Sequence, residues 1–159
     1  MGLQEEEIFA GLASFPGVEG RLQYLGEVNN VKIYNDNNAT TPAAVIMGMK
    51  AVGNSDDANI VWLGGGAKKD VDPTELLATI PQFCKKVILL AGTGTDTIKD
   101  VIECEVVESI EEGVKAGLAG GQPGDVLLFS PGFASFGMFK NEYERNDEFL
   151  RVINSLNSE

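Results

Sequence analysis

Three short apolar runs, each ending in glycine or serine, constrain most strongly how this chain can fold. They are NIVWLGG at 59–65, KVILLAG at 86–92 and DVLLFS at 125–130. Their apolar character is continuous rather than alternating, which is typical of strands that are buried on both faces of a sheet. Segments with helical patterns separate them. The sequence therefore predicts an α/β fold, a mostly parallel sheet with helices on both faces.

The remaining elements are predicted from apolar spacing and from capping signals. Residues 21–36 read as two short strands joined at Asn29-Asn30, which makes an N-terminal hairpin. Helices are predicted at 4–14, 40–52, 72–80, 97–102, 110–120 and 138–156, and one more strand at 104–109. The length of 159 residues suits one core, so residues 1–159 are predicted to form a single domain.

Composition excludes several classes of function. The chain carries 24 acidic and 12 basic residues, a formal charge of −12, which argues against non-specific binding to nucleic acid or to an anionic membrane surface. It contains no histidine, so Ser-His-Asp and Cys-His mechanisms and His-ligated metals are ruled out within this chain. Two cysteines, Cys84 and Cys104, make no disulfide framework and no metal cluster, which favours a reducing compartment.

Four segments rich in small polar residues follow the predicted strands. They are NDNNATT at 35–41, GGGAKKD at 64–70, AGTGTD at 91–96 and SPGFAS at 130–135. In parallel sheets ligands bind beyond the carboxyl ends of the strands, so these segments are expected to line one edge. Each could also be an ordinary turn. GGGAKKD is not a phosphate-binding loop, because no Ser or Thr follows its lysine, and AGTGTD lacks the third glycine of a dinucleotide site.

The last of these segments raises a separate question. Small residues run from Ser130 to Gly137, and Ser135 falls near the predicted start of the final helix. Uncovered backbone at a helix start suits either a tight turn or a small anion such as a carboxylate. Alone, the residues predict an α/β domain with a polar, glycine-rich edge that carries one or two lysines.

Taken together and in this order, NDNNATT, GGGAKK and SPGFASFGMFKNEYERNDEF resemble the C-terminal domain of the Mur ligases. These enzymes form amide bonds with ATP in peptidoglycan synthesis, and the pattern is most similar to that of the UDP-N-acetylmuramoyl-L-alanine:D-glutamate ligases. The resemblance covers nearly the whole chain. It implies a Rossmann-like domain that brings D-glutamate, or a similar small amino acid, to an acyl-phosphate made on a central ATPase domain of the same longer chain.

The resemblance also implies site residues. Thr40, Lys68, Ser135 and Phe136 match positions that would receive D-glutamate. In this assignment Lys68 is the cation for a carboxylate, Thr40 and Ser135 donate hydrogen bonds, and Phe136 contributes its backbone or ring. Asp36 and Arg21 match positions that would contact the nucleotide across the gap between domains. ATP and Mg²⁺ would be bound mainly by the central domain, and no metal is assigned to this chain.

Several positions depart from the family pattern. Asn38 stands where the family has lysine, Ala67 where it has an acidic residue, Gly137 where it has aspartate, and Glu142 where it has an aromatic residue. Lys69 beside Lys68 could change which lysine faces a ligand.

Because the chain contains no phosphate-binding loop, it is expected to be inactive alone. Three readings remain. The favoured one is a domain excised from a full ligase; a second is an inactive binding or regulatory module of the same fold. The folylpolyglutamate synthase branch is a weaker third, because its first motif usually contains a histidine.

Overall fold

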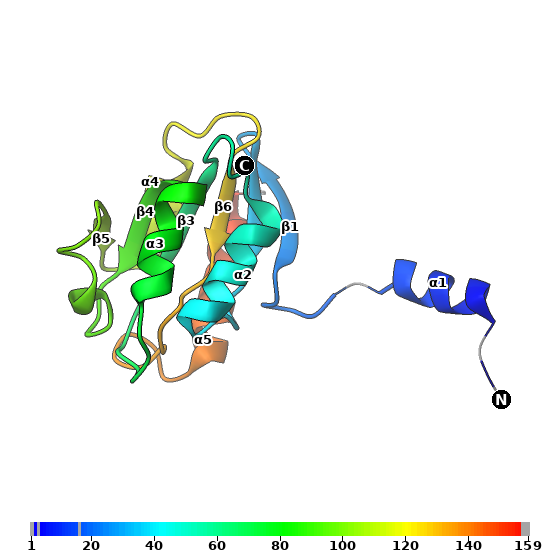
Figure 1. Ribbon diagram of the computed structural model, residues 1–159, viewed down its shortest axis with the longest axis horizontal. Coiled ribbons are helices and arrows are strands. Elements are labelled where there is room, and N and C mark those ends of the chain that lie inside the picture. The colour runs from blue at the N-terminus through cyan, green and yellow to red at the C-terminus, as the bar shows by residue number, and fades with distance from the viewer. Residues whose placement is uncertain (1, 3, 16, 157–159) are drawn as a thin grey trace.

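The computed structural model describes residues 2, 4–15 and 17–156 and shows a six-stranded sheet between two layers of helices (Figure 1). The strands lie in the order β1-β2-β6-β3-β4-β5; β1 is antiparallel to β2 and every other neighbouring pair is parallel. The mostly parallel α/β fold with an N-terminal hairpin is therefore confirmed. The elements are α1 Glu5–Ala13, β1 Gln23–Val28, β2 Val31–Asn35, α2 Pro42–Val52, β3 Ile60–Gly65, α3 Thr74–Phe83, β4 Cys84–Leu90, a 3-10 turn Thr95–Thr97, β5 Glu105–Val107, α4 Ile110–Leu118, β6 Val126–Phe129 and α5 Glu142–Leu156.

Two apolar cores lie on opposite faces of the sheet. Helices α2 and α3 cover one face, where Trp62 and Leu128 are fully buried, and α4 and α5 cover the other, where Leu63 and Phe129 are fully buried. Consecutive residues of β3 and β6 thus point into different cores, which explains why their apolar runs do not alternate. Phe129 stacks on Phe149 of α5 with ring centroids 4.3 Å apart.

Local signals at two predicted elements are confirmed in detail, and a third helix has a cap of the same kind that was not predicted. Asn29 and Asn30 both have positive φ, 52° and 65°, as a tight two-residue hairpin turn requires. Thr41 caps α2, because its hydroxyl accepts from the Ala44 N–H at 3.4 Å, and Pro42 opens the helix. Ser109 caps α4 in the same way through the Glu112 N–H at 3.1 Å.

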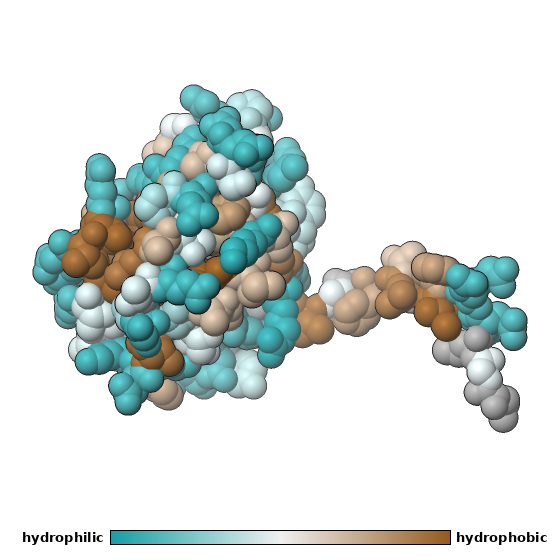
Figure 2. Space-filling model, in the orientation of Figure 1, coloured by the Kyte–Doolittle hydropathy of each residue, from teal (hydrophilic) through white to brown (hydrophobic). Residues whose placement is uncertain are grey.

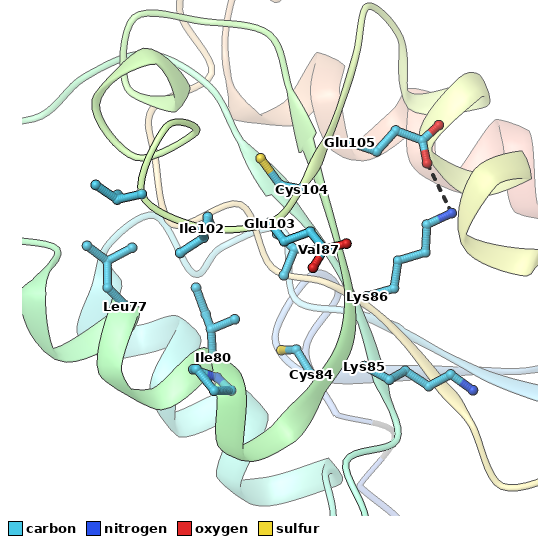
Figure 3. A pocket seen from close by; sticks show the side chains of 12 residues that line it. Leu77, Ile80, Cys84, Lys85, Lys86, Val87, Ile102, Glu103, Cys104 and Glu105 are labelled. Atoms are coloured by element: carbon cyan, nitrogen blue, oxygen red, sulfur yellow. Dashed lines mark ion pairs between the residues drawn. The ribbon is translucent and has the colours of Figure 1, made fainter.

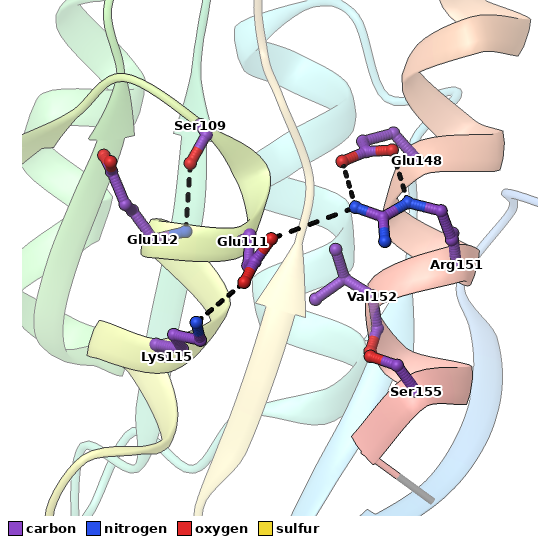
Figure 4. Close-up of polar contacts among 8 residues, drawn as sticks. All are labelled: Ser109, Glu111, Glu112, Lys115, Glu148, Arg151, Val152 and Ser155. Atoms are coloured by element: carbon purple, nitrogen blue, oxygen red, sulfur yellow. Dashed lines mark hydrogen bonds and ion pairs between the residues drawn. The ribbon is translucent and has the colours of Figure 1, made fainter. Parts of the chain in front are cut away.

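Helices α4 and α5 are also joined at the surface (Figure 4). Arg151 of α5 pairs with Glu148 at 2.7 Å and reaches Glu111 of α4 at 3.9 Å. Glu111 pairs in turn with Lys115 at 2.7 Å. These side chains are largely exposed, so solvent screens the pairs and each contributes little to stability.

The loops at the carboxyl ends of the strands contact one another through backbone hydrogen bonds. Ala67 and Ala134 exchange N–H···O bonds of 2.9 and 3.1 Å, and the Gly132 N–H donates to the Ala39 carbonyl at 2.8 Å. The Gly94 N–H donates to the Gly66 carbonyl at 2.8 Å. The four polar segments therefore lie at one edge of the sheet, as predicted.

The predicted start of the final helix is wrong. Helix α5 begins at Glu142, not at 138, and residues 136–141 form turns and bends. Gly137 has φ +97°, and the Asn141 side chain accepts from the Glu144 N–H at 2.9 Å and so caps the helix later in the chain. Ser135 therefore lies in a loop, seven residues before the helix, and not at a helix N-terminus.

Three other boundaries differ from the prediction. The segment at 97–102 is not an α-helix; a 3-10 turn covers Thr95–Thr97 and turns follow it. Helix α3 runs on to Phe83, with Pro81 inside it, and passes directly into β4. The strand expected at 104–109 is confined to Glu105–Val107, because it pairs with β4 only over Ile88–Leu90.

Among the described residues, no helix combines the length and the apolar character needed to cross a membrane.

Candidate functional site

A polar cleft of about 320 Å³ lies at the carboxyl edge of the sheet. We call it the loop cleft. It is lined by Arg21, Asn38, Thr40, Lys69, Ala134, Ser135, Phe136, Glu142 and Tyr143. The loop at 35–41, the loop at 64–70 (the lysine loop), the 130–137 segment and the start of α5 all contribute to it. Four of the six residues predicted for the site, Arg21, Thr40, Ser135 and Phe136, are thus brought together.

Lys69 is the lysine that lines the loop cleft. Its side chain is half-buried, and its Nζ donates to the backbone carbonyl of Thr40 at 3.0 Å. This bond uses one of the three ammonium hydrogens, so others can bind a ligand in the cleft. The contact places a positive charge beside Thr40.

Lys68, which the family pattern assigned to the carboxylate, is not among the residues that line the cleft. Its side chain is exposed, and its backbone N–H donates to the Thr93 hydroxyl at 3.0 Å. The two lysines are adjacent in the sequence, but their side chains have different surroundings: that of Lys69 is half-buried, whereas that of Lys68 is exposed. The role of Lys68 in ligand binding stays a prediction.

Ser135 and Phe136 lie side by side in the chain but in different surroundings. Ser135 is 6% exposed, whereas the Phe136 ring is 65% exposed at the rim of the cleft. The loop is held by the Ala67–Ala134 bridge and by a bond from the Phe139 N–H to the Ser135 carbonyl at 3.1 Å. The Ser135 hydroxyl is therefore presented on backbone that is fixed on both sides.

The two residues predicted to contact a nucleotide occupy different positions. Arg21 is exposed and lines the loop cleft. Asp36 is 8% exposed, and both of its carboxylate oxygens accept hydrogen bonds: Oδ1 from the Leu22 N–H at 3.0 Å and Oδ2 from the Ser130 hydroxyl at 2.9 Å. In this structure Asp36 joins the ends of β2 and β6 to the segment before β1. A contact with nucleotide stays a prediction for both.

Burial raises the pKa of Asp36 above its ordinary value of 3.8, although the bonds from Ser130 and Leu22 and the charge of Arg21 act in the opposite direction. The folded state thus binds this proton more tightly than the unfolded state does. The contribution of the Asp36 proton to the free energy of unfolding is therefore fully present below pH 3.8, and it is lost as the pH rises through the raised pKa. We expect Asp36→Asn to gain stability relative to the parent protein as the pH rises from below 3.8 to neutrality. Urea unfolding at a series of pH values measures the difference.

Asp72→Asn is the control with the opposite sign. Hydrogen bonds from the Thr74 hydroxyl and backbone N–H lower the pKa of Asp72. The ionised Asp72 therefore contributes to the free energy of unfolding above pH 3.8, and this contribution is lost as the pH falls through the lowered pKa. The Asp72→Asn variant should lose stability relative to the parent as the pH rises. Parallel pH profiles for the parent and Asp36→Asn would contradict the argument from burial.

Arg145 was not recognised from the sequence as a site residue, yet it organises the loops behind the cleft. It is 1% exposed; its Nε donates to Asn37 Oδ1 at 2.8 Å, Nη2 to the Asn37 carbonyl at 3.0 Å and Nη1 to the Phe133 carbonyl at 3.2 Å. Burial lowers the pKa of Arg145 to about 10, so the side chain still carries its charge at neutral pH. The sequence did contain a signal for the burial of Arg145: it lies four residues before Phe149, and so on the same, buried face of α5.

Two of the residues that line the cleft, Asn38 and Glu142, depart from the family pattern. Asn38 donates from Nδ2 to the Glu19 carbonyl at 3.1 Å, so it holds the segment that precedes Arg21. Glu142 and Tyr143 open α5 at the cleft, and both are exposed. The cleft thus combines two cations, Arg21 and Lys69, with one carboxylate, that of Glu142.

A second cavity, of about 700 Å³, is lined by residues of α3, of β4 and of the segment 101–105 (Figure 3). Leu77, Ile80, Val87 and Ile102 form its apolar wall. Lys86 at its rim pairs with Glu105 at 3.0 Å. The partly apolar lining and the paired lysine do not suit an amino acid with several charges.

Both cysteines line this second cavity. Burial raises the pKa of Cys84 to about 12, and burial also raises the pKa of Cys104. Both thiols are therefore protonated at neutral pH and are poor nucleophiles. Within the described part of the chain, no group of three or more Cys, Asp or Glu side chains is placed to hold a metal ion.

Comparison with known proteins gives one family match. The model of the Mur ligase glutamate ligase domain matches residues 20–133. The UDP-N-acetylmuramoylalanine--D-glutamate ligase of Pseudomonas fluorescens strain Pf-5 is 36% identical over 160 residues, which cover 98% of this chain and 36% of the relative. The enzyme of the same name from a Roseiflexus species is 35% identical, over 98% of this chain and 34% of the relative. The chain thus spans about a third of the length of these relatives.

Solved structures share the fold. The MurF ligase of Thermotoga maritima in complex with ADP matches with a TM-score of 0.64 and 19% identity, over 92% of this chain and 33% of that one. The folylpolyglutamate synthase of the same organism matches with a TM-score of 0.59 and 18% identity, over 98% of this chain and 36% of that one. At these identities the likeness concerns the fold alone.

Proposed function

Because the chain belongs to the Mur ligase family, whose glutamate ligase domain matches residues 20–133, we propose that it is the C-terminal part of a longer peptidoglycan ligase and that the loop cleft binds the incoming D-glutamate. The curated relatives with 35% and 36% identity are named as D-glutamate ligases. The observation that carries the proposal is the gathering of Arg21, Lys69, Thr40 and Ser135 in one cleft.

The charges of the loop cleft complement those of glutamate. Free glutamate at neutral pH has two carboxylates and one ammonium group, and the cleft offers two cations, Arg21 and Lys69, and one carboxylate, Glu142. Charge-assisted hydrogen bonds to carboxylates contribute about 1.5–3 kcal/mol each. The Thr40 and Ser135 hydroxyls can add neutral bonds that orient the ligand. In this proposal Lys69, and not Lys68, is the lysine that binds a carboxylate.

ATP would activate the other substrate as an acyl-phosphate on a central domain that is not part of this chain. The residues described here have no cluster for Mg²⁺, so the metal and most of the nucleotide belong in the proposal to that domain. The present chain then binds and orients the amino acid and excludes water from it. We therefore expect no phosphate release from ATP by this chain alone. The proposal places the protein in the cytoplasm, where ATP is available.

An NMR titration of amide shifts with D-glutamate, and with L-glutamate as control, tests the proposal. Half of the site is absent, so binding should be weak and concentrations of about 10 mM are needed. We expect shifts at Thr40, Lys69 and residues 133–137 with the D isomer. Lys69→Ala should weaken binding by about tenfold, the equivalent of about 1.4 kcal/mol, because it removes a charge-assisted bond.

Lys68→Ala is the matched control, because it removes an equal charge one residue away. It should leave binding nearly unchanged if Lys69 holds the carboxylate. The reverse result, loss of binding in Lys68→Ala alone, would restore the assignment made from the family pattern. Equal shifts with both isomers, or none with either, would count against D-glutamate and would favour a binding or regulatory module of this fold.

A further inference from the structure

A groove of about 400 Å³ lies between the start of α4 and the first half of α5. We call it the acidic groove. It is lined by residues 108–110 and 138–139 and by Glu144, Asp147, Glu148 and Arg151. None of these residues lines the loop cleft. The acidic groove is therefore a separate site on the surface of this domain.

The floor of the acidic groove is apolar. Ile110 of α4 is 1% exposed, and Met138 and Phe139 are half-buried against the same core. A methionine side chain is unbranched and polarisable, so it adapts to apolar groups of different shapes. The floor therefore offers an adaptable contact for an apolar side chain of a partner.

The rim of the acidic groove is strongly negative. Its only cation among the lining residues is Arg151, and its four carboxylates are those of Glu108, Glu144, Asp147 and Glu148. Arg151 donates to both carboxylate oxygens of Glu148, at 2.7 and 2.8 Å, and reaches Glu111 as well (Figure 4). The positive charge of Arg151 is thus already committed, and the other carboxylates of the rim are not neutralised by it.

Two of these carboxylates have no partner. The side chains of Glu108 and Asp147 are exposed and make no hydrogen bond or ion pair within the part of the chain that the structure describes. Asp147 follows Glu144 by three positions on α5, so these like charges share one face of the helix and repel each other. Asp147 also lies beyond the first turn, where the helix N-terminus would stabilise a carboxylate. A cation bound over the groove would relieve this repulsion.

The charge of the whole molecule favours the same kind of partner. Hydrophilic residues are spread over the face that Figure 2 draws, and the chain has a formal charge of −12. A basic partner is therefore attracted from a distance and is then held at short range. The carboxylates of the rim are distributed over two helices around an apolar floor, which suits several cations spaced along a peptide better than one small amine.

We propose that the acidic groove is a docking site for a basic segment of a partner protein. An apolar side chain of that segment contacts the floor, and flanking Lys or Arg side chains pair with the rim. This inference goes beyond the proposed function and does not rest on it. The Phe139 N–H donates to the Ser135 carbonyl at 3.1 Å, so a docked segment contacts the loop that also presents Ser135 to the loop cleft.

An NMR titration of the 159-residue chain with synthetic peptides tests the proposal. The probe is the peptide KKLLKK with blocked ends. EELLEE reverses its charge, KKGGKK removes its apolar part, and hexylamine stands for a small organic cation. We expect KKLLKK to shift the amides of residues 108–110, 138–139 and 144–151, with a dissociation constant of about 1 mM, because exposed ion pairs are individually weak. Raising the salt concentration from about 20 mM to about 500 mM should weaken binding about tenfold, because salt screens exposed charges.

Asp147→Asn combined with Glu108→Gln should weaken the binding of KKLLKK by about tenfold, because it removes both unpartnered carboxylates of the rim. Neither substitution breaks a side-chain contact of the described residues, so the variant should stay folded. Asp57→Asn combined with Glu27→Gln is the matched control. It removes the same two kinds of carboxylate from exposed positions outside the groove and should leave binding unchanged.

Three results would overturn the proposal directly. They are equal binding of KKLLKK and EELLEE, no shifts with KKLLKK up to about 10 mM, and unchanged binding in the Asp147→Asn, Glu108→Gln variant. Equal affinity for KKGGKK would show that the apolar floor plays no part and would also contradict it. Equal affinity for hexylamine would assign the acidic groove to a small organic cation instead. None of these results depends on whether the loop cleft binds glutamate.

Discussion

Replacing Arg145 by alanine should lower the free energy of unfolding by about 3 kcal/mol, because three buried acceptors lose their donors at about 1 kcal/mol each. These acceptors are the side-chain and backbone oxygens of Asn37 and the carbonyl of Phe133. The guanidinium is 1% exposed, so water cannot replace it without opening the loops. Urea denaturation, with the midpoint and slope fitted separately, measures the loss.

Arg151→Ala is the matched control, because it removes the same side chain from the same helix. Arg151 is exposed and pairs with Glu148 and Glu111 at the surface (Figure 4), so its loss should cost less than about 1 kcal/mol. Equal costs for the two variants would mean that the desolvation of the Arg145 charge offsets its three hydrogen bonds. In Arg145→Ala we also expect weaker ligand binding, because Asn37 and Phe133 flank the loops that form the loop cleft.

Replacing Gly65 by alanine should destabilise the protein by about 4 kcal/mol, through backbone strain and overpacking together. Gly65 ends β3 with φ +96°, and its N–H donates to the Pro131 carbonyl at 2.9 Å. An added Cβ would lie 2.5 Å from the Leu90 carbonyl oxygen and 2.7 Å from the Leu90 nitrogen. Because these are backbone atoms of the neighbouring strand, they cannot move aside without disturbing the sheet.

Gly137→Ala separates the two causes. Gly137 has nearly the same φ, +97°, but no atom lies within 4 Å of the position of its added Cβ. Its substitution should cost only the strain of the left-handed backbone, about 1 kcal/mol. Thermal or urea unfolding of both variants gives the difference. If Gly65→Ala cost no more than Gly137→Ala, the close approach of β3 and β4 at this point would not be rigid.

The layered α/β fold could be predicted because its signals are local and repeated. Each central strand is a continuous apolar run, and the residues that cap a helix or close the hairpin, such as Thr41 and Asn29-Asn30, act within a few positions of themselves. The edge that gathers the polar loops follows from the parallel order of the strands. The start of α5 could not be placed, because the helical pattern of the sequence begins at 138, whereas residues 136–141 form turns and bends in the structure. The left-handed backbone of Gly137 and the helix cap by Asn141 delay the start of the helix to Glu142.

What the amino-acid sequence determined is the class of fold, its polar edge and four of the nine residues that line the loop cleft. Only the tertiary structure decided that Lys69 rather than Lys68 lines that cleft, that Asp36 is bonded to Ser130 and Leu22, and that Arg145 is buried. The physical reason is the range of the interactions. The contacts of Asp36 and Arg145 join residues that are 94 and 108 positions apart, and side-chain direction in the lysine loop depends on bonds to Thr40 and Thr93. Such pairings form only when the strands have been brought side by side.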